Sequence, residues 1–151
     1  MSGLTNGYVE SIGKKHCKGF LGVFPCNIQP TIKQINKNFS LIFNESKHNE
    51  DGSHFIAVFS NSHKIYYFDS LGLKCENEYI LKFINQFNKE IIENNVQIQS
   101  YNSIFCGYFC LAFVIFMSIN KNHKSFFEIF NVKNLKLNDQ IVVDLLIKLL
   151  N

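Results

Sequence analysis

Arginine and tryptophan are absent from this sequence of 151 residues, and charged residues make up only 18% of it. All fifteen basic residues are therefore lysine. Without the planar guanidinium group, which holds guanine or phosphate through two parallel hydrogen bonds, sequence-specific reading of DNA is disfavoured. The net charge of +3 is compatible with weak, nonspecific contact with DNA and indicates nothing stronger.

The cysteines lack the pattern of a disulfide framework or of a structural zinc site. Their number is odd, their spacing is irregular and no CxxC pair occurs: Cys17, Cys26, Cys75, Cys106 and Cys110. The opening residues, "MSGLTNGYVE", lack the basic region and apolar run of a signal peptide. A glycine-rich phosphate loop is also missing. We therefore predict free thiols in a reducing intracellular compartment, with neither metal nor cofactor.

One apolar run of sixteen residues extends from Ile104 to Ile119. A membrane-spanning helix needs about 20 apolar residues, and this run is interrupted by Gly107 and Ser118. The run predicts the buried central helix of a soluble domain and no membrane contact.

Hydrophobic residues make up 46% of the chain, enough for one folded domain over residues 1–151. Apolar residues at three- and four-residue steps predict helices, and alternating or β-branched runs predict strands. The expected helices cover 5–14, 76–94, 103–119 and 138–150, and the expected strands 19–27, 39–43, 54–60, 63–70 and 96–99. Asn138 or Asp139 is the expected N-cap of the last helix. A tight hairpin among separate helices indicates an α+β fold rather than a doubly wound sheet.

Cys106 stands where the last expected strand gives way to the apolar helix, in "QSYNSIFCGYFC" (99–110). A cysteine nucleophile must be a thiolate, which a helix N-terminus and a neighbouring imidazole both favour. Asn102 and Ser103 are residue types that cap helices. Taken alone, however, a cysteine here is more typical of a buried core thiol.

His54 and Asp69 occupy the two outer ends of the expected hairpin. With the turn centred between Asn61 and Ser62, the two residues lie directly opposite each other and point to the same face. A carboxylate beside an imidazole fixes its tautomer and favours its charged form. A surface ion pair without catalytic function is the alternative. The other histidines, His16, His48, His63 and His123, have no comparable partner, and we expect them on the surface.

Gln99 ends the expected strand that leads to Cys106. Its side-chain amide can donate a hydrogen bond to the oxyanion that forms when a thiolate attacks a carbonyl, and the backbone N–H of Cys106 can supply a second donor. A glutamine at a strand end has no such meaning by itself.

These residues together resemble adenain, the adenovirus-type maturation protease, in the clan that includes the ubiquitin-like-protein proteases. The order His, acid, Gln, Cys is that of the clan. "GSHFIAVF" is similar to the strand of the catalytic histidine, "YYFDSLG" to the strand of the acid, and "QSYNSIFCGYFC" to the nucleophile block. The resemblance implies a mostly antiparallel sheet packed by helices, with His54, Asp69, Gln99 and Cys106 as the catalytic residues.

The chain departs from adenovirus enzymes in its acid, which is Asp69 rather than Glu, in Phe55 where tryptophan is usual, and in a shorter C-terminal part. A compact relative from a virophage, a Polinton-type element or another double-stranded DNA virus fits this pattern. The resemblance implies a monomeric cysteine endopeptidase that cleaves capsid precursors in the virion or the infected cell. The alternatives are a protease acting on ubiquitin-like modifiers and a catalytically inactive capsid-interaction module.

Overall fold

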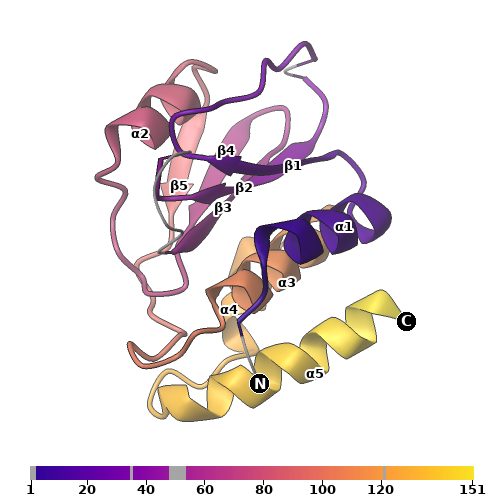
Figure 1. Cartoon of the computed structure of the whole chain (residues 1–151), viewed down its shortest axis with the longest axis vertical. Helices are drawn as coiled ribbons and strands as arrows, with labels where there is room; N and C mark the ends of the chain where they lie inside the picture. Colours follow the sequence, from indigo (N-terminus) through magenta and orange to yellow (C-terminus); the bar gives the residue numbers. More distant parts are fainter. Residues whose placement is uncertain (1–2, 35, 48–53, 121) are drawn as a thin grey trace.

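A five-stranded sheet of order β1-β2-β3-β4-β5 lies at the centre of the computed structural model (Figure 1). The structure describes residues 3–34, 36–47, 54–120 and 122–151. The strands are β1 (Phe20–Pro25), β2 (Phe39–Asn44), β3 (Phe55–Ser60), β4 (Lys64–Phe68) and β5 (Glu90–Glu93). The three middle strands pair antiparallel, and each edge strand joins them in parallel. The predicted α+β fold is therefore confirmed, with the antiparallel pairing confined to the middle of the sheet.

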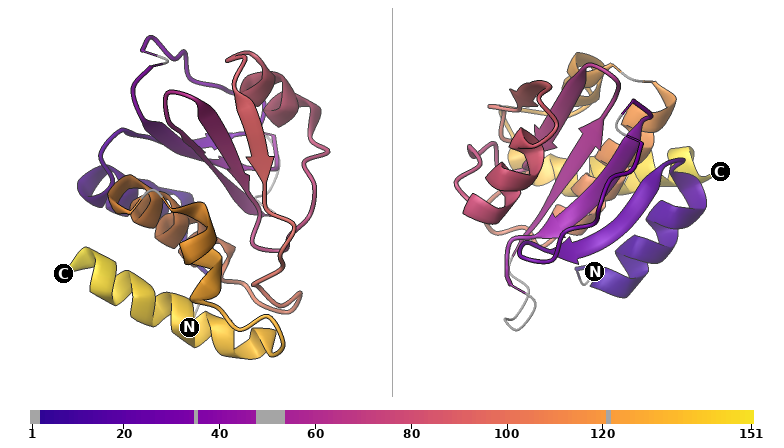
Figure 2. Two further views of the ribbon diagram at one scale, coloured as in Figure 1. Left: turned by 180° about the vertical axis from the view of Figure 1, so that it is seen from behind. Right: turned by 90° about the horizontal axis from the view of Figure 1, so that it is seen from above.

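Helices cover both faces of this sheet (Figure 2). The apolar helix α3 (Cys106–Ile119) lies against one face, together with α1 (Asn6–His16) and α4 (His123–Glu128). Helix α5 (Asn138–Leu150) packs on the outer side of α3. Helix α2 (Glu78–Asn85) packs against the opposite face.

The alternation of side chains along the strands supplies two separate cores. In β3, Phe55, Ala57 and Phe59 point towards α3, whereas Ile56 and Val58 point towards α2. Helix α3 has apolar residues on all sides because it lies between the sheet and α5. Among the described residues, no helix combines the length and the apolar character needed to cross a membrane.

The predicted helix over 76–94 is too long, and the predicted strand over 96–99 is wrong. Helix α2 ends at Asn85, and Asn88 adopts a left-handed conformation with φ 53°, which turns the chain back. Residues 90–93 then pair with the open edge of β4 as β5. Apolar residues at helical spacing continue to Ile91, so periodicity did not reveal this break. Pairing with the edge of the sheet prevailed over local helix propensity.

The last helix begins where predicted, but its capping differs. Helix α5 has Leu137 as N-cap, with no side-chain capping bond. The side chain of Asn138 instead donates to the carbonyls of Ile98 and Asn131, and that of Asp139 accepts from the Ser103 hydroxyl. Both expected capping residues therefore connect α5 to other segments.

A glycine-to-alanine substitution at Gly72 tests the backbone of the turn after β4, and the same substitution at Gly7 in α1 is its control. Gly72 has φ +71°, and an added Cβ would lie 2.8 Å from the backbone nitrogen of Gln97. Gly72→Ala should therefore lower the free energy of unfolding by about 1–3 kcal/mol, as a left-handed non-glycine residue does. Gly7→Ala, in α1 with open space around it, should raise it by about 0.5 kcal/mol. Urea denaturation measures both, and equal effects would contradict this account of the turn.

Candidate active site

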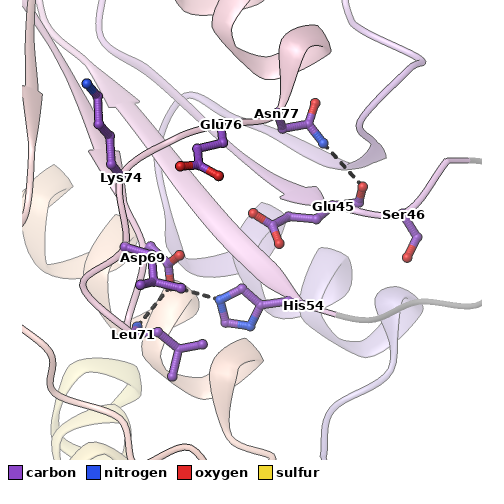
Figure 3. Close-up of a pocket in the computed structure, with 9 residues that line it drawn as sticks. Glu45, Ser46, His54, Asp69, Leu71, Lys74, Glu76 and Asn77 are labelled. Carbon is purple, nitrogen blue, oxygen red and sulfur yellow. Dashed lines mark hydrogen bonds and ion pairs between the residues drawn. The ribbon is translucent and has the colours of Figure 1, made fainter.

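His54 and Asp69 lie side by side at one end of the sheet (Figure 3). The imidazole Nε2 is 2.8 Å from the carboxylate Oδ1 of Asp69. His54 immediately precedes β3, and its carbonyl accepts from the backbone N–H of Glu45, which extends the β2–β3 ladder. Asp69 directly follows β4 and is only 2% exposed. A buried carboxylate at hydrogen-bonding distance orients the imidazole and stabilises its charged form.

The two residues meet diagonally and not directly opposite each other. Ala57 pairs with Phe68, which places the centre of the turn one residue later than predicted. In this turn the Oδ1 of Asn61 accepts from the backbone N–H groups of His63 and Lys64. A two-residue change in pairing keeps side chains on the same face, so the prediction that His54 and Asp69 are neighbours holds although the register was wrong.

Asn94 holds the backbone of Asp69 from both sides, and the sequence analysis missed it. Its Oδ1 accepts from the N–H of Asp69 at 2.9 Å, and its Nδ2 donates to the carbonyl of Asp69 at 2.6 Å. The N–H of Leu71 donates to the Asp69 carboxylate at 2.9 Å. Asn94 acts on a backbone 25 residues away, so no local pattern could have indicated it.

Cys106 is the first residue of α3 and is half-buried. Burial raises the pKa of its thiol, but a hydrogen bond with His54, further hydrogen bonds to the backbone of Phe55 and Gly107, and the charge of His54 outweigh burial and lower it. The helix begins without a side-chain cap, since the Ser103 hydroxyl accepts from the N–H of Phe105 instead. The sulfur therefore lies at an uncapped helix N-terminus, which also favours the thiolate.

The pKa of His54 shifts in the opposite direction to that of Cys106. Burial lowers it, but hydrogen bonds with Asp69 and Cys106 and their negative charges raise it to about 10. A raised imidazole pKa beside a lowered thiol pKa favours a thiolate–imidazolium pair at neutral pH. By contrast, full burial raises the pKa of Cys110 well above its usual value, which makes that thiol inert.

Gln99 lies in the loop between β5 and α3. The prediction that it ends a strand is therefore wrong. Gln99 is 2% exposed, and its backbone N–H donates to the carbonyl of Ser70. Its Oε1 accepts from the Ser70 hydroxyl, and its Nε2 donates to the carbonyl of Ser103 at 2.9 Å. These two bonds fix which way the amide faces. The second hydrogen on Nε2 has no partner among the bonds of the described residues, so it can serve a substrate oxygen.

The other histidines differ from one another. His63 is exposed and His16 is half-buried, whereas His48 lies outside the described residues. His123 does not fit the expectation of a surface residue, because its ring packs against Tyr66 and Phe127 and its buried Nε2 has no hydrogen-bond partner in the described chain. Burial lowers the pKa of His123. It forms part of an aromatic cluster away from Cys106.

A cavity of about 680 Å³ opens beside the His54–Asp69 pair. Glu45, Glu76 and Asn77 line its other side, and Figure 3 shows Glu45 between Asn77 and the imidazole. Burial raises the pKa of Glu45, and the positive charge of His54 only partly offsets this. Within the described segments, no three His, Cys, Asp or Glu side chains are grouped so as to hold a metal ion. The cavity is open space next to the imidazole, and Cys106 and Gln99 are not among the residues that line it.

No protein-family model and no curated protein matches the sequence. The fold matches the crystal structure of the Se-Met ASFV pS273R protease with a TM-score of 0.65 and 14% sequence identity, over 91% of this chain and 66% of that one. The chain has the fold of that protease. At this identity the likeness concerns the fold alone, and the chain spans 66% of the length of the matched protein.

The pH dependence of thiol alkylation tests the ion pair. Iodoacetamide reacts with thiolates, so labelling of Cys106 should reach half its maximal rate below the pH at which an ordinary thiol does. His54→Ala removes the hydrogen bond and charge that favour the thiolate but leaves the burial that opposes it. The midpoint should therefore move to higher pH, as followed by mass spectrometry of the Cys106 peptide. An unchanged midpoint would mean that His54 does not control this thiol.

Proposed function

We propose that this protein is a cysteine endopeptidase with Cys106 as nucleophile, His54 as general base and acid, Asp69 as the residue that orients His54, and Gln99 as oxyanion donor. The observation that carries the proposal is the 2.8 Å hydrogen bond between His54 and Asp69 beside a cavity, together with the interaction with His54 that lowers the pKa of the Cys106 thiol. The fold shared with the ASFV pS273R protease supports it, as does the resemblance of the three motifs to adenain.

In the proposed reaction, each of these residues takes part in a defined step of amide hydrolysis. The Cys106 thiolate attacks the peptide carbonyl, and the negative oxygen that forms is stabilised by the Gln99 amide and the Cys106 N–H. The imidazolium of His54 then gives its proton to the leaving amine as the C–N bond breaks, which leaves a thioester. Neutral His54 next removes a proton from water, whose oxygen attacks the thioester carbonyl. The C–S bond then breaks and releases the carboxylic acid, which regenerates the Cys106 thiolate beside the imidazolium of His54.

Capsid precursor proteins are the proposed substrates, and virion maturation in the infected cell is the proposed role. Both rest on the resemblance to adenain in the nucleophile block, where seven steps separate Gln99 from Cys106 and Phe105 precedes the nucleophile. Incubation of the purified protein with candidate capsid precursors, followed by mapping of the new termini, tests this part. The absence of any new terminus with Cys106 intact and reactive would contradict it.

A protease for ubiquitin-like modifiers is a second candidate, favoured by one specific feature. Asp69 and the segment "FDSLG" are closer to those proteases than to adenovirus enzymes. A ubiquitin-like modifier with an electrophile at its C-terminus would label Cys106 in this case. An inactive capsid-interaction module, by contrast, would show Cys106 reacting no faster than Cys17 or Cys75.

Substitution of the two cysteines of α3 separates nucleophile from core thiol. Cys106→Ala should abolish peptide cleavage, because the pKa of the Cys106 thiol is lowered whereas burial raises the pKa of Cys17, Cys75 and Cys110. Cys110→Ala is the matched control one helical turn away; it should keep cleavage activity and lose about 1 kcal/mol of stability for one buried sulfur. Cleavage rates and thermal unfolding measure both effects. Loss of activity in Cys110→Ala with an active Cys106→Ala would reverse the assignment.

Replacement of the proposed oxyanion donor should affect catalysis more than binding. Gln99→Ala should lower kcat by about 10²-fold with little change in KM, which is typical of the loss of one oxyanion donor. The measurement is steady-state hydrolysis of a peptide that the wild type cleaves. A change confined to KM would instead assign Gln99 to substrate binding.

A further inference from the structure

The first turn of helix α5 is joined by hydrogen bonds to the loop that carries Gln99. Asn138 is completely buried, and its Nδ2 donates to the carbonyl of Ile98 at 2.8 Å, one residue before Gln99. The Asp139 carboxylate accepts from the Ser103 hydroxyl, also at 2.8 Å. These contacts link segments that are 40 and 36 residues apart in the sequence. A helix far from the sheet thus reaches the residues on both sides of the proposed oxyanion donor.

Ser103 is the point at which these contacts meet. Its hydroxyl donates to Asp139 and accepts from the N–H of Phe105 at 3.1 Å, and its carbonyl accepts from Gln99 Nε2 at 2.9 Å. One residue is therefore held by α5, supports the start of α3 and receives one of the two Gln99 amide hydrogens. Together with Ser70, which donates to Gln99 Oε1, Ser103 determines where the remaining Gln99 amide hydrogen points.

Packing alone holds this loop weakly. Tyr101 is 73% exposed and Ile104 is 56% exposed, so the stretch between Gln99 and Phe105 has few buried apolar contacts. Segments with few buried contacts open locally at low free-energy cost unless hydrogen bonds fix them. The bond between Ser103 and Asp139 attaches the middle of this stretch to α5. Its loss would leave Ser103 held only by the bond from its N–H to the Ser100 carbonyl and by the bond from Phe105 to its hydroxyl, so that the Ser103 carbonyl, and with it the Gln99 amide, could shift.

We propose that Asp139 is a positioning residue for the reaction: through Ser103 it holds the Gln99 amide in the orientation that binds the oxyanion. The inference rests on the proposed function, in which Gln99 is the oxyanion donor. Asp139 touches neither substrate nor the reacting atoms. Misplacement of an oxyanion donor by about 1 Å is enough to cost much of its stabilisation, because the bond is effective over a narrow range of distance.

Under the proposal, formation of the Cys106 thiolate and stabilisation of the oxyanion depend on different residues. Formation of the thiolate depends on His54 and Asp69, which are held by the ends of β3 and β4 and by Asn94. Stabilisation of an oxyanion depends on Gln99, which is held by Ser70 and Ser103. Loss of Asp139 should therefore impair attack on carbonyls and leave attack on a saturated carbon intact.

Two reagents measure these properties without a known peptide substrate. p-Nitrophenyl acetate acetylates a thiolate through a tetrahedral oxyanion, with p-nitrophenolate as leaving group. Iodoacetamide alkylates the same thiolate by displacement of iodide, with no oxyanion. The ratio of acetylation to alkylation at Cys106, followed by intact mass and peptide mapping at one pH, reports the oxyanion site alone.

Asp139→Ala should lower this ratio by about tenfold, somewhat less than Gln99→Ala, because the donor is displaced and not removed. Asp139→Asn should restore most of the ratio, since its amide oxygen can still accept from the Ser103 hydroxyl. Asp144→Ala is the matched control, as Asp144 is an exposed carboxylate on α5 that contacts Gln140. Its ratio should equal that of the wild type.

Three outcomes would overturn the inference. An unchanged ratio in Asp139→Ala would show that the bond does not position Gln99. An equal fall of acetylation and alkylation would show that Asp139 supports the fold in general. An unchanged ratio in Gln99→Ala would show that Gln99 is not the oxyanion donor. That result would contradict the proposed function itself, and the Gln99→Ala variant alone distinguishes it from a failure of the Asp139 inference.

Discussion

The hydrogen bond between His54 Nε2 and Asp69 Oδ1 constrains the rest of the site. Because Nε2 is directed at the carboxylate, Nδ1 is the ring nitrogen that remains for the sulfur of Cys106. The carboxylate can accept this bond only if the start of β3 and the end of β4 lie at the same end of the sheet. The antiparallel pairing across the turn at Asn61 places them there. A one-residue change in register would turn His54 to the opposite face of the sheet.

Three separate parts of the fold supply the residues of the proposed site. The sheet supplies the imidazole and the carboxylate, the start of α3 supplies the sulfur, and the loop before α3 supplies the amide of Gln99 (Figure 1). Each part is fixed by contacts of its own: ladder pairing and Asn94 for the first, the apolar core between the sheet and α5 for the second, Ser70 and α5 for the third. Such a division allows the proposed thiolate and the proposed oxyanion site to be held independently.

Much of this arrangement could be predicted from the sequence, and the failures have physical causes. The hairpin, the apolar helix and the proximity of His54 to Asp69 depend on short-range patterns, which the sequence displays directly. The break in the helix after Asn85 depends on the open edge of β4, a tertiary demand that helical periodicity conceals. Asn94 and Asp139 act across more than twenty residues on a backbone or a hydroxyl group, so their side chains carry no local pattern. Gln99 was found through its resemblance to a motif, although the strand expected around it does not exist.

The central claim is that Cys106 forms a covalent intermediate with the carbonyl of its substrate. Rapid acid quenching during cleavage of a peptide substrate, followed by mass spectrometry of the digested protein, tests it most directly. The account predicts an acyl group attached as a thioester to Cys106, whose occupancy rises in the first turnover. The acyl group should be absent from Cys106→Ala. Hydrolysis that proceeds with no acyl group on Cys106, or with one on another residue, would contradict it.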